Sequence, residues 1–250
     1  MTGLDALSPW LLVLVPVVVF TAYTVLGLTG FGSTMVSIPI LAHFLPLSYL
    51  VPLMALIDCV SAASVMRQGR GDVSKAELKR LVPLMFVCFL IGLTVLVGVP
   101  DRYLRVALGL FAAAVGIHGI LNPTVRGSIS SLWVIPAGLV GGVVAAIFGA
   151  GGPIYATYFA GRLKDKGQMR STMSALIAIS AFSRAILYAI GGLVLHAAVF
   201  LGVAVCAPFA WLGLRVGSRI HVSLSQEQMR RAIGAVLLLT GLSLLARALL

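Results

Sequence analysis

The sequence predicts an all-α polytopic membrane protein with two inverted structural repeats, whose glycine-broken helices meet at mid-membrane. Composition is the first reason for this prediction. Of the 250 residues, 60% are hydrophobic and only 10% are charged, and the mean hydropathy is +1.09. A soluble domain of this size carries about 25% charged residues. The other two reasons are a pair of glycine-rich stretches and an uneven distribution of basic residues.

The two glycine-rich stretches interrupt long apolar runs. The first covers residues 27–34 (GLTGFGST) and the second covers residues 148–153 (FGAGGP). Glycine adopts backbone angles that other residues resist, so both stretches predict a break in a helix. Broken backbone inside a bilayer is tolerated only where it is buried in protein or lines a watery cavity. Alternatively, the glycines only allow neighbouring helices to pack closely.

A broken membrane helix also exposes a helix N-terminus, where free N–H groups and the helix dipole favour an anion. Two such breaks at matching positions are typical of the half-sites of secondary transporters. We therefore expect a small anionic substrate to bind between them. The predicted binding residues in the two stretches are Gly30, Phe31, Gly32, Ser33, Thr34, Gly149, Ala150, Gly151, Gly152 and Pro153.

Two charged residues, Asp58 and Arg184, lie well inside apolar runs. A charge inside the membrane is costly and indicates a functional site by default. The arginine fork donates paired hydrogen bonds to an oxyanion, so Arg184 is the predicted counter-charge of the substrate. Asp58 is predicted to neutralise Arg184 or to take part in proton coupling. The alternative is a structural ion pair that joins the two halves.

The apolar runs repeat in the same order in the two halves of the chain. The segment 104–109 (LRVALG) matches the segment 229–234 (MRRAIG), and a further glycine follows each after seven residues. We therefore predict a first transmembrane repeat at residues 1–125 and a second at 126–250. The predicted runs are 10–28, 33–46, 48–66, 81–99 and 104–121, then 132–148, 151–160, 171–191, 194–214 and 231–249.

The basic residues decide between two membrane topologies. If each broken region crosses once, giving eight crossings, the loop Lys and Arg residues divide 10 against 7. If each crosses twice, the loops 67–80, 122–131, 161–170 and 215–231 share one side and carry 14 basic residues. The other side then carries three, Arg102, Arg105 and Arg247. The second arrangement fits the positive-inside rule better, and five segments per half make the repeats inverted.

Several other functions find no support in the sequence. No HExxH, GxSxG or P-loop motif is present, and the three cysteines stand singly, so we expect neither an enzyme nor a metal or other cofactor. The positive charge follows the membrane loops, so we expect no nucleic-acid partner. The expected partners are the anion and the lipid bilayer, and a homo-oligomer is left open. An anion channel remains the alternative, and Tyr155, Tyr158 and Tyr188 fit either a pathway or interfacial anchors.

Two halves that each open with an apolar helix broken by a glycine cluster and followed by proline resemble the sulfite exporter TauE/SafE family of membrane permeases. The matching positions are Gly30, Gly32, Pro39, Gly149, Gly151, Gly152 and Pro153. The resemblance covers nearly the whole chain. It implies a multi-pass protein of the inner (cytoplasmic) membrane that moves sulfur-containing anions, such as sulfite, sulfoacetate and related sulfonates, often outward. It also implies about eight membrane helices, against ten membrane-entering segments from the charges.

Overall fold

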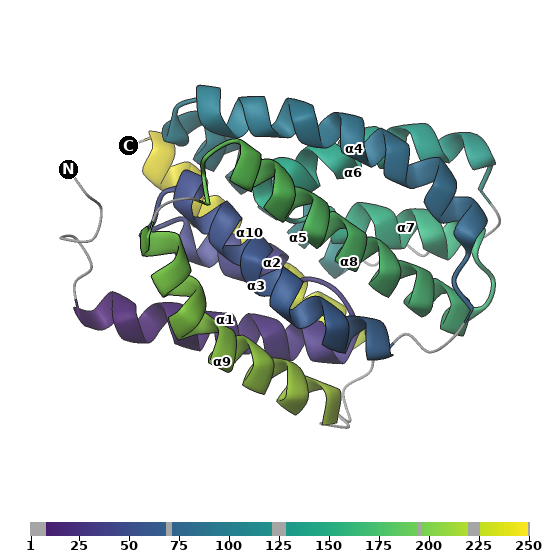
Figure 1. The fold of residues 1–250 in the computed structure, drawn as a ribbon, viewed down its shortest axis with the longest axis horizontal. Helices are drawn as coiled ribbons and strands as arrows, with labels where there is room; N and C mark the ends of the chain where they lie inside the picture. The colour runs from purple at the N-terminus through teal and green to yellow at the C-terminus, as the bar shows by residue number, and fades with distance from the viewer. Residues whose placement is uncertain (1–8, 69–71, 122–128, 195–196, 220–225, 250) are drawn as a thin grey trace.

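The computed structural model describes residues 9–68, 72–121, 129–194, 197–219 and 226–249 (Figure 1). Within these ranges the chain forms ten α-helices, one short 3₁₀ helix and no strand. The helices are α1 (Pro9–Thr29), α2 (Ser33–Leu41), α3 (Leu47–Gln68), α4 (Lys75–Gly98), α5 (Asp101–Leu121), α6 (Val134–Phe148), α7 (Gly152–Arg162), α8 (Lys166–Ile190), α9 (Ala197–Arg219) and α10 (Gln226–Leu249), and the 3₁₀ helix is Ser131–Trp133.

Seven of the described helices are long and apolar enough to cross a membrane. The helix α3 adds a shorter apolar part, Leu47–Ala62. By contrast, α2 has 9 residues and α7 has 11, about half of the roughly 20 that a spanning helix needs. The predicted all-α polytopic membrane fold is thereby confirmed, with α2 and α7 as half-length helices.

Both short helices follow an interruption at a glycine-rich stretch. The helix α1 ends at Thr29 and α2 begins at Ser33, and between them Gly30 and Gly32 have φ angles of 85° and 101°. Likewise α6 ends at Phe148 and α7 begins at Gly152, and Gly149 between them has a φ angle of 66°. These values lie in the left-handed region of backbone angles, which residues with a Cβ atom rarely adopt.

Several helices extend beyond the apolar runs, so the polar loops are shorter than the sequence predicts. The helix α4 begins inside the expected loop 67–80, and α8 begins inside the expected loop 161–170. Likewise α9 continues to Arg219 and α10 begins at Gln226, both inside the expected loop 215–231. Hydropathy marks only the part of a helix inside hydrocarbon, whereas Lys, Arg, Glu and Gln continue a helix well in water.

The helices pack in pairs that relate the two halves. The helix α1 packs on α9, and its counterpart α6 packs on α4; α3 packs on α8, and α5 packs on α10 (Figure 1). In the α5–α10 pair, a Cβ atom on Gly109 would lie 3.0 Å from the carbonyl oxygen of Gly241, and one on Gly116 would lie 2.7 Å from that of Gly234. In the predicted repeats Gly109 corresponds to Gly234 and Gly116 corresponds to Gly241. Exchanging the two repeats therefore turns the first contact into the second. This pairing supports the two repeats, whose inverted relation stays a prediction.

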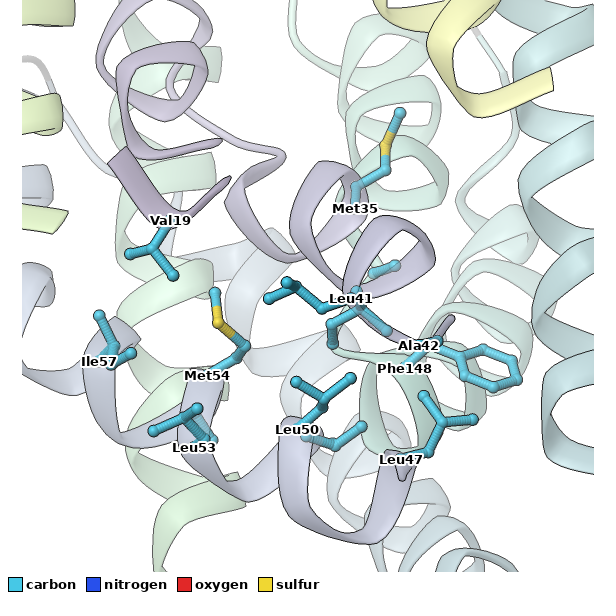
Figure 2. Packing of buried hydrophobic residues seen from close by; sticks show 14 of the residues in the cluster. Val19, Met35, Leu41, Ala42, Leu47, Leu50, Leu53, Met54, Ile57 and Phe148 are labelled. Carbon is cyan, nitrogen blue, oxygen red and sulfur yellow. The ribbon is translucent and has the colours of Figure 1, made fainter. Parts of the chain in front are cut away.

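A large apolar cluster surrounds α2 and the first half of α3 (Figure 2). Leu50, Leu53 and Ile57 of α3 are completely buried. They pack in the same cluster as Leu41 of α2 and Val19 of α1. Other apolar side chains on the outer helices are exposed, including Leu90 on α4 and Leu239 on α10, as expected for surfaces that face lipid. The buried cluster fixes α2 against α3, which positions the break before α2.

The described parts of two basic loops, residues 72–80 and 161–170, lie at the same end of the molecule (Figure 1). There the amide of Ser74 donates to the hydroxyl of Thr172 over 3.0 Å, and the amide of Ile129 donates to the carbonyl of Gly161 over 3.0 Å. At the opposite end the guanidinium of Arg102 contacts the carbonyl of Ala248. The expected loops 67–80 and 161–170 therefore lie at the same end, as five segments per half require.

This arrangement gives a prediction about membrane orientation. In a background without Cys59, Cys88 and Cys206, single cysteines at Asp72 and Lys164 should react only with a reagent applied to the cytoplasmic side. The physical reason is the excess of basic residues in the loops at this end.

A cysteine at the exposed Tyr103, at the other end, is the matched control and should react only from the opposite side. Labelling of the positions 72 and 164 from different sides would contradict the inverted repeats.

Candidate functional site

The two glycine-rich breaks meet in the interior of the protein. The hydroxyl of Thr34, in the first turn of α2, donates to the carbonyl oxygen of Gly149 over 2.6 Å. Nearby, the ring of Phe31 packs against Gly152, where an added Cβ atom would come within 3.3 Å of the ring. Residues 115 positions apart are thus in direct contact. The first turns of α2 and α7 both border the same cavity.

Asp58 of α3 and Arg184 of α8 form a buried ion pair beside this contact. The Nη2 atom of Arg184 lies 3.1 Å from Oδ2 of Asp58, and the two side chains are 3% and 7% exposed. The other carboxylate oxygen, Oδ1, accepts hydrogen bonds from the hydroxyl of Tyr23 over 2.6 Å and from that of Ser33 over 3.2 Å. Asp58 therefore has three donors, from α1, α2 and α8.

The cavity between these elements has a volume of about 40 Å³. About 10–15 Å³ of such space holds one water molecule, so the cavity accommodates a few waters. Of the predicted residues, Phe31, Gly32, Ser33, Thr34, Gly149, Ala150, Gly151, Gly152, Pro153, Asp58 and Arg184 line it. Gly30 is not part of the lining, although it shapes the turn into α2 with its φ angle of 85°. The structure thus brings together two sequence motifs and two isolated charges.

Polar atoms without a partner are found in the lining of this cavity. Among the described residues, the buried Nε and Nη1 atoms of Arg184 and the buried hydroxyl of Tyr155 make no hydrogen bond. Buried polar groups are nearly always hydrogen-bonded, and leaving one unpaired costs about 1–3 kcal/mol. Both Arg184 and Tyr155 line the cavity, a space that a substrate or water can enter.

The first turns of α2 and α7 add backbone donors. The amide of Val36 is the first in α2 with a helical partner, the carbonyl of Gly32. The amides of Ser33, Thr34 and Met35 precede it at the positive end of the helix. In α7, the amide of Tyr155 is the first with such a partner, the carbonyl of Gly151. With the Arg184 guanidinium, these groups favour negative charge in the cavity.

Sequence reasoning missed Tyr23, which donates to Asp58, and left Tyr155 undecided. Tyr23 lies in an uninterrupted apolar run, and only the phenolic hydroxyl in the middle of that run could have indicated a polar partner. Tyr155 fitted either a pathway or an interfacial anchor, and the structure shows it 2% exposed at the cavity. The neighbouring Tyr158 instead donates to Glu77, and Tyr188 to the carbonyl of Ala146, so neither lies free in the cavity.

Comparison with known proteins identifies the family. The model of the family described as "Sulfite exporter TauE/SafE" matches residues 15–244. The chain belongs to this family. It is also 29% identical over 187 residues to the "Probable inner membrane transporter protein TsaS" of Comamonas testosteroni. The aligned region covers 73% of this chain and 77% of that protein. No solved structure matches the chain.

Membership of the TauE/SafE family gives the interior cavity a context. The family model spans all ten helices, from within α1 to within α10. Together with the seven apolar helices, the similarity to an inner membrane transporter confirms the expected multi-pass protein of the inner membrane. This TauE/SafE protein is a membrane transporter, and its interior cavity is the candidate position of the substrate.

Proposed function

We propose that the protein is a secondary transporter, in the outward direction, of sulfur-containing anions such as sulfite, sulfoacetate or related organosulfonates. The substrate binds between the two glycine-rich breaks with Arg184 as its counter-charge. The observation that carries the proposal is the buried guanidinium of Arg184, of which Nε and Nη1 have no partner and which lines the cavity between the two breaks. Two parallel N–H groups of the planar guanidinium match two oxygens of a sulfonate or sulfite. The free Nε and Nη1 are not such a pair with each other, so one of them would act together with the second N–H of Nη2, whose first N–H is directed at Asp58.

Asp58 holds this guanidinium in place when no anion is bound. Its Oδ2 atom pairs with Arg184, while Oδ1 keeps the hydroxyl donors of Tyr23 and Ser33. An arriving oxyanion can therefore share the guanidinium without leaving the carboxylate unsolvated. The ion pair keeps the charges in the interior balanced when no anion is bound, which matters because an unpaired charge is costly inside a membrane.

Transport requires the walls of the cavity to move apart. A cavity of about 40 Å³ holds only a few water molecules, so binding of an anion as large as sulfoacetate is expected to displace α2, α7 or α8. The short helices α2 and α7 contact each other through the hydrogen bond from Thr34 to Gly149. Movement of one repeat against the other around such a contact is the form of alternating access that inverted repeats allow.

The alternative function is an anion channel, or a permease for a different small anion. The same arginine could line a pore. We favour a transporter because the cavity lies between two helices that are broken at glycine-rich stretches, an arrangement typical of transporter substrate sites.

Flux through the purified protein in proteoliposomes tests the proposal. We expect flux of sulfite or sulfoacetate that saturates with substrate concentration and responds to an imposed ion gradient. The other anion serves as competitor, and protein-free liposomes give the background. Flux that rises linearly with concentration and ignores the gradient would favour a channel, and transport of chloride but of neither sulfur anion would contradict the proposed substrate class.

A further inference from the structure

A second cavity lies at the end of the molecule opposite the basic loops, between the start of α5 and the end of α10. Its volume is about 400 Å³, ten times that of the interior cavity, and the two share no lining residue. A volume in this range accommodates a small ligand. The polar residues that line it are His43, Asp101, Arg102, Arg105 and Arg247.

The lining carries an excess of positive charge. Among the described residues, three guanidinium groups and one carboxylate, that of Asp101, line the cavity. This carboxylate is already engaged, because it accepts from Nε of Arg105 over 2.6 Å and from the amide of Leu47 over 2.9 Å. Nε and Nη2 of Arg102 donate to the carbonyl of Ala248. In the described part of the chain, the guanidinium of Arg247 has no hydrogen-bond or ion-pair partner.

The position of these arginines is unexpected for the end on which they lie. The sequence places 14 basic residues in the loops of the other end and three at this one. All three, Arg102, Arg105 and Arg247, line the same cavity. Positive residues are sparse on the non-cytoplasmic side of membrane proteins. Three arginines that lay there by chance would not be expected to line one cavity, yet these three do so from two different helices, α5 and α10.

We propose that this cavity is a second oxyanion-binding site, separate from the interior one. Its ligand carries a sulfonate, sulfate or phosphate group, which Arg247 binds while Arg102 and Arg105, held by Ala248 and Asp101, fix the shape of the site. The group reaches the site either as a free anion from solution or as the headgroup of an anionic phospholipid. The argument stands on this cavity alone and does not depend on the transport function.

Sulfate binding to the full-length protein in nanodiscs of neutral phosphatidylcholine tests the site, with isothermal titration calorimetry as the measurement. Because Arg247 provides a charge-assisted bond, Arg247→Gln should weaken this binding about tenfold, and Arg247→Glu should abolish it. Arg230→Gln is the matched control, since Arg230 is an exposed arginine on the same helix outside the cavity. Melting temperatures should be unchanged in all three variants.

Two further arms identify the source of the oxyanion and separate this site from the interior one. Arg184→Lys, which alters only the interior site, should leave the Arg247-dependent binding intact. In nanodiscs with anionic phosphatidylglycerol, unchanged sulfate affinity indicates a free anion. Weaker sulfate binding, with bound phosphatidylglycerol that native mass spectrometry detects on the wild type but not on Arg247→Gln, indicates a lipid headgroup. Equal binding by wild type and both Arg247 variants, or an equal loss in Arg230→Gln, would overturn the proposal.

Discussion

Replacing Arg184 with alanine is expected to abolish transport and to lower the free energy of unfolding by about 3–5 kcal/mol. The substitution leaves Asp58 buried with two hydroxyl donors and no cation. Arg184→Lys keeps the positive charge but loses the planar fork. The lysine variant should fold, yet bind sulfite or sulfonate well below wild type. Binding, proteoliposome flux and melting temperature of each variant check these results.

The double variant Asp58→Asn with Arg184→Gln separates a substrate role of Arg184 from a structural one. When both charges are removed together, no buried charge is left without a partner, so most of the stability should return. If Arg184 serves the substrate, this double variant folds but neither binds nor transports the anion. If the pair only joins α3 and α8, both folding and transport return. Near-normal flux through the double variant would refute the role that we assign to Arg184.

Replacing Gly149 with alanine is expected to remove most transport while the other helices stay folded. A Cβ atom at this position would lie 2.8 Å from Nη1 of Arg184 and 3.1 Å from Cβ of Thr34. The guanidinium would have to move away from the cavity, or the contact between the two breaks would have to open. The positive φ angle of 66° adds about 1–2 kcal/mol of backbone strain. The measurement is sulfite flux, with the melting temperature as a second readout.

Gly192→Ala is the matched control for this substitution. Gly192 has a similar φ angle of 76°, but a Cβ atom there would meet nothing within 4 Å. It should therefore show the backbone strain alone, with a lower melting temperature and normal flux. If the two alanine variants transported equally well, the crowding around Gly149 would have no functional consequence.

Much of the architecture could be predicted from the sequence because it depends on properties of single segments. Hydropathy reports which segments lie in hydrocarbon, so the runs that became α1 and α5 were located to within a few residues. The starts of α4, α8 and α10 were wrong because charged residues continue a helix beyond the hydrocarbon. The positions of the breaks could be predicted because glycine readily adopts the positive φ angles that Gly30, Gly32 and Gly149 have, and this preference is local.

The site itself was predictable in part. Asp58 and Arg184 were recognisable because a charge within an apolar run is rare and costly wherever the chain folds. Their pairing was not determined by the sequence, which left open an ion pair, a substrate counter-charge and proton coupling. The contact between them joins residues 126 positions apart and requires α3 and α8 to face each other.

The sequence by itself determined that this chain crosses a membrane, where its helices are interrupted and which loops carry positive charge. Only the tertiary structure decided that Tyr155 ends without a partner in the cavity, and that Arg102, Arg105 and Arg247 share one cavity. The physical reason is that hydropathy and backbone preference belong to individual segments. A side-chain partner instead depends on how each helix is rotated and which helix it packs against, and close packing between distant segments fixes both.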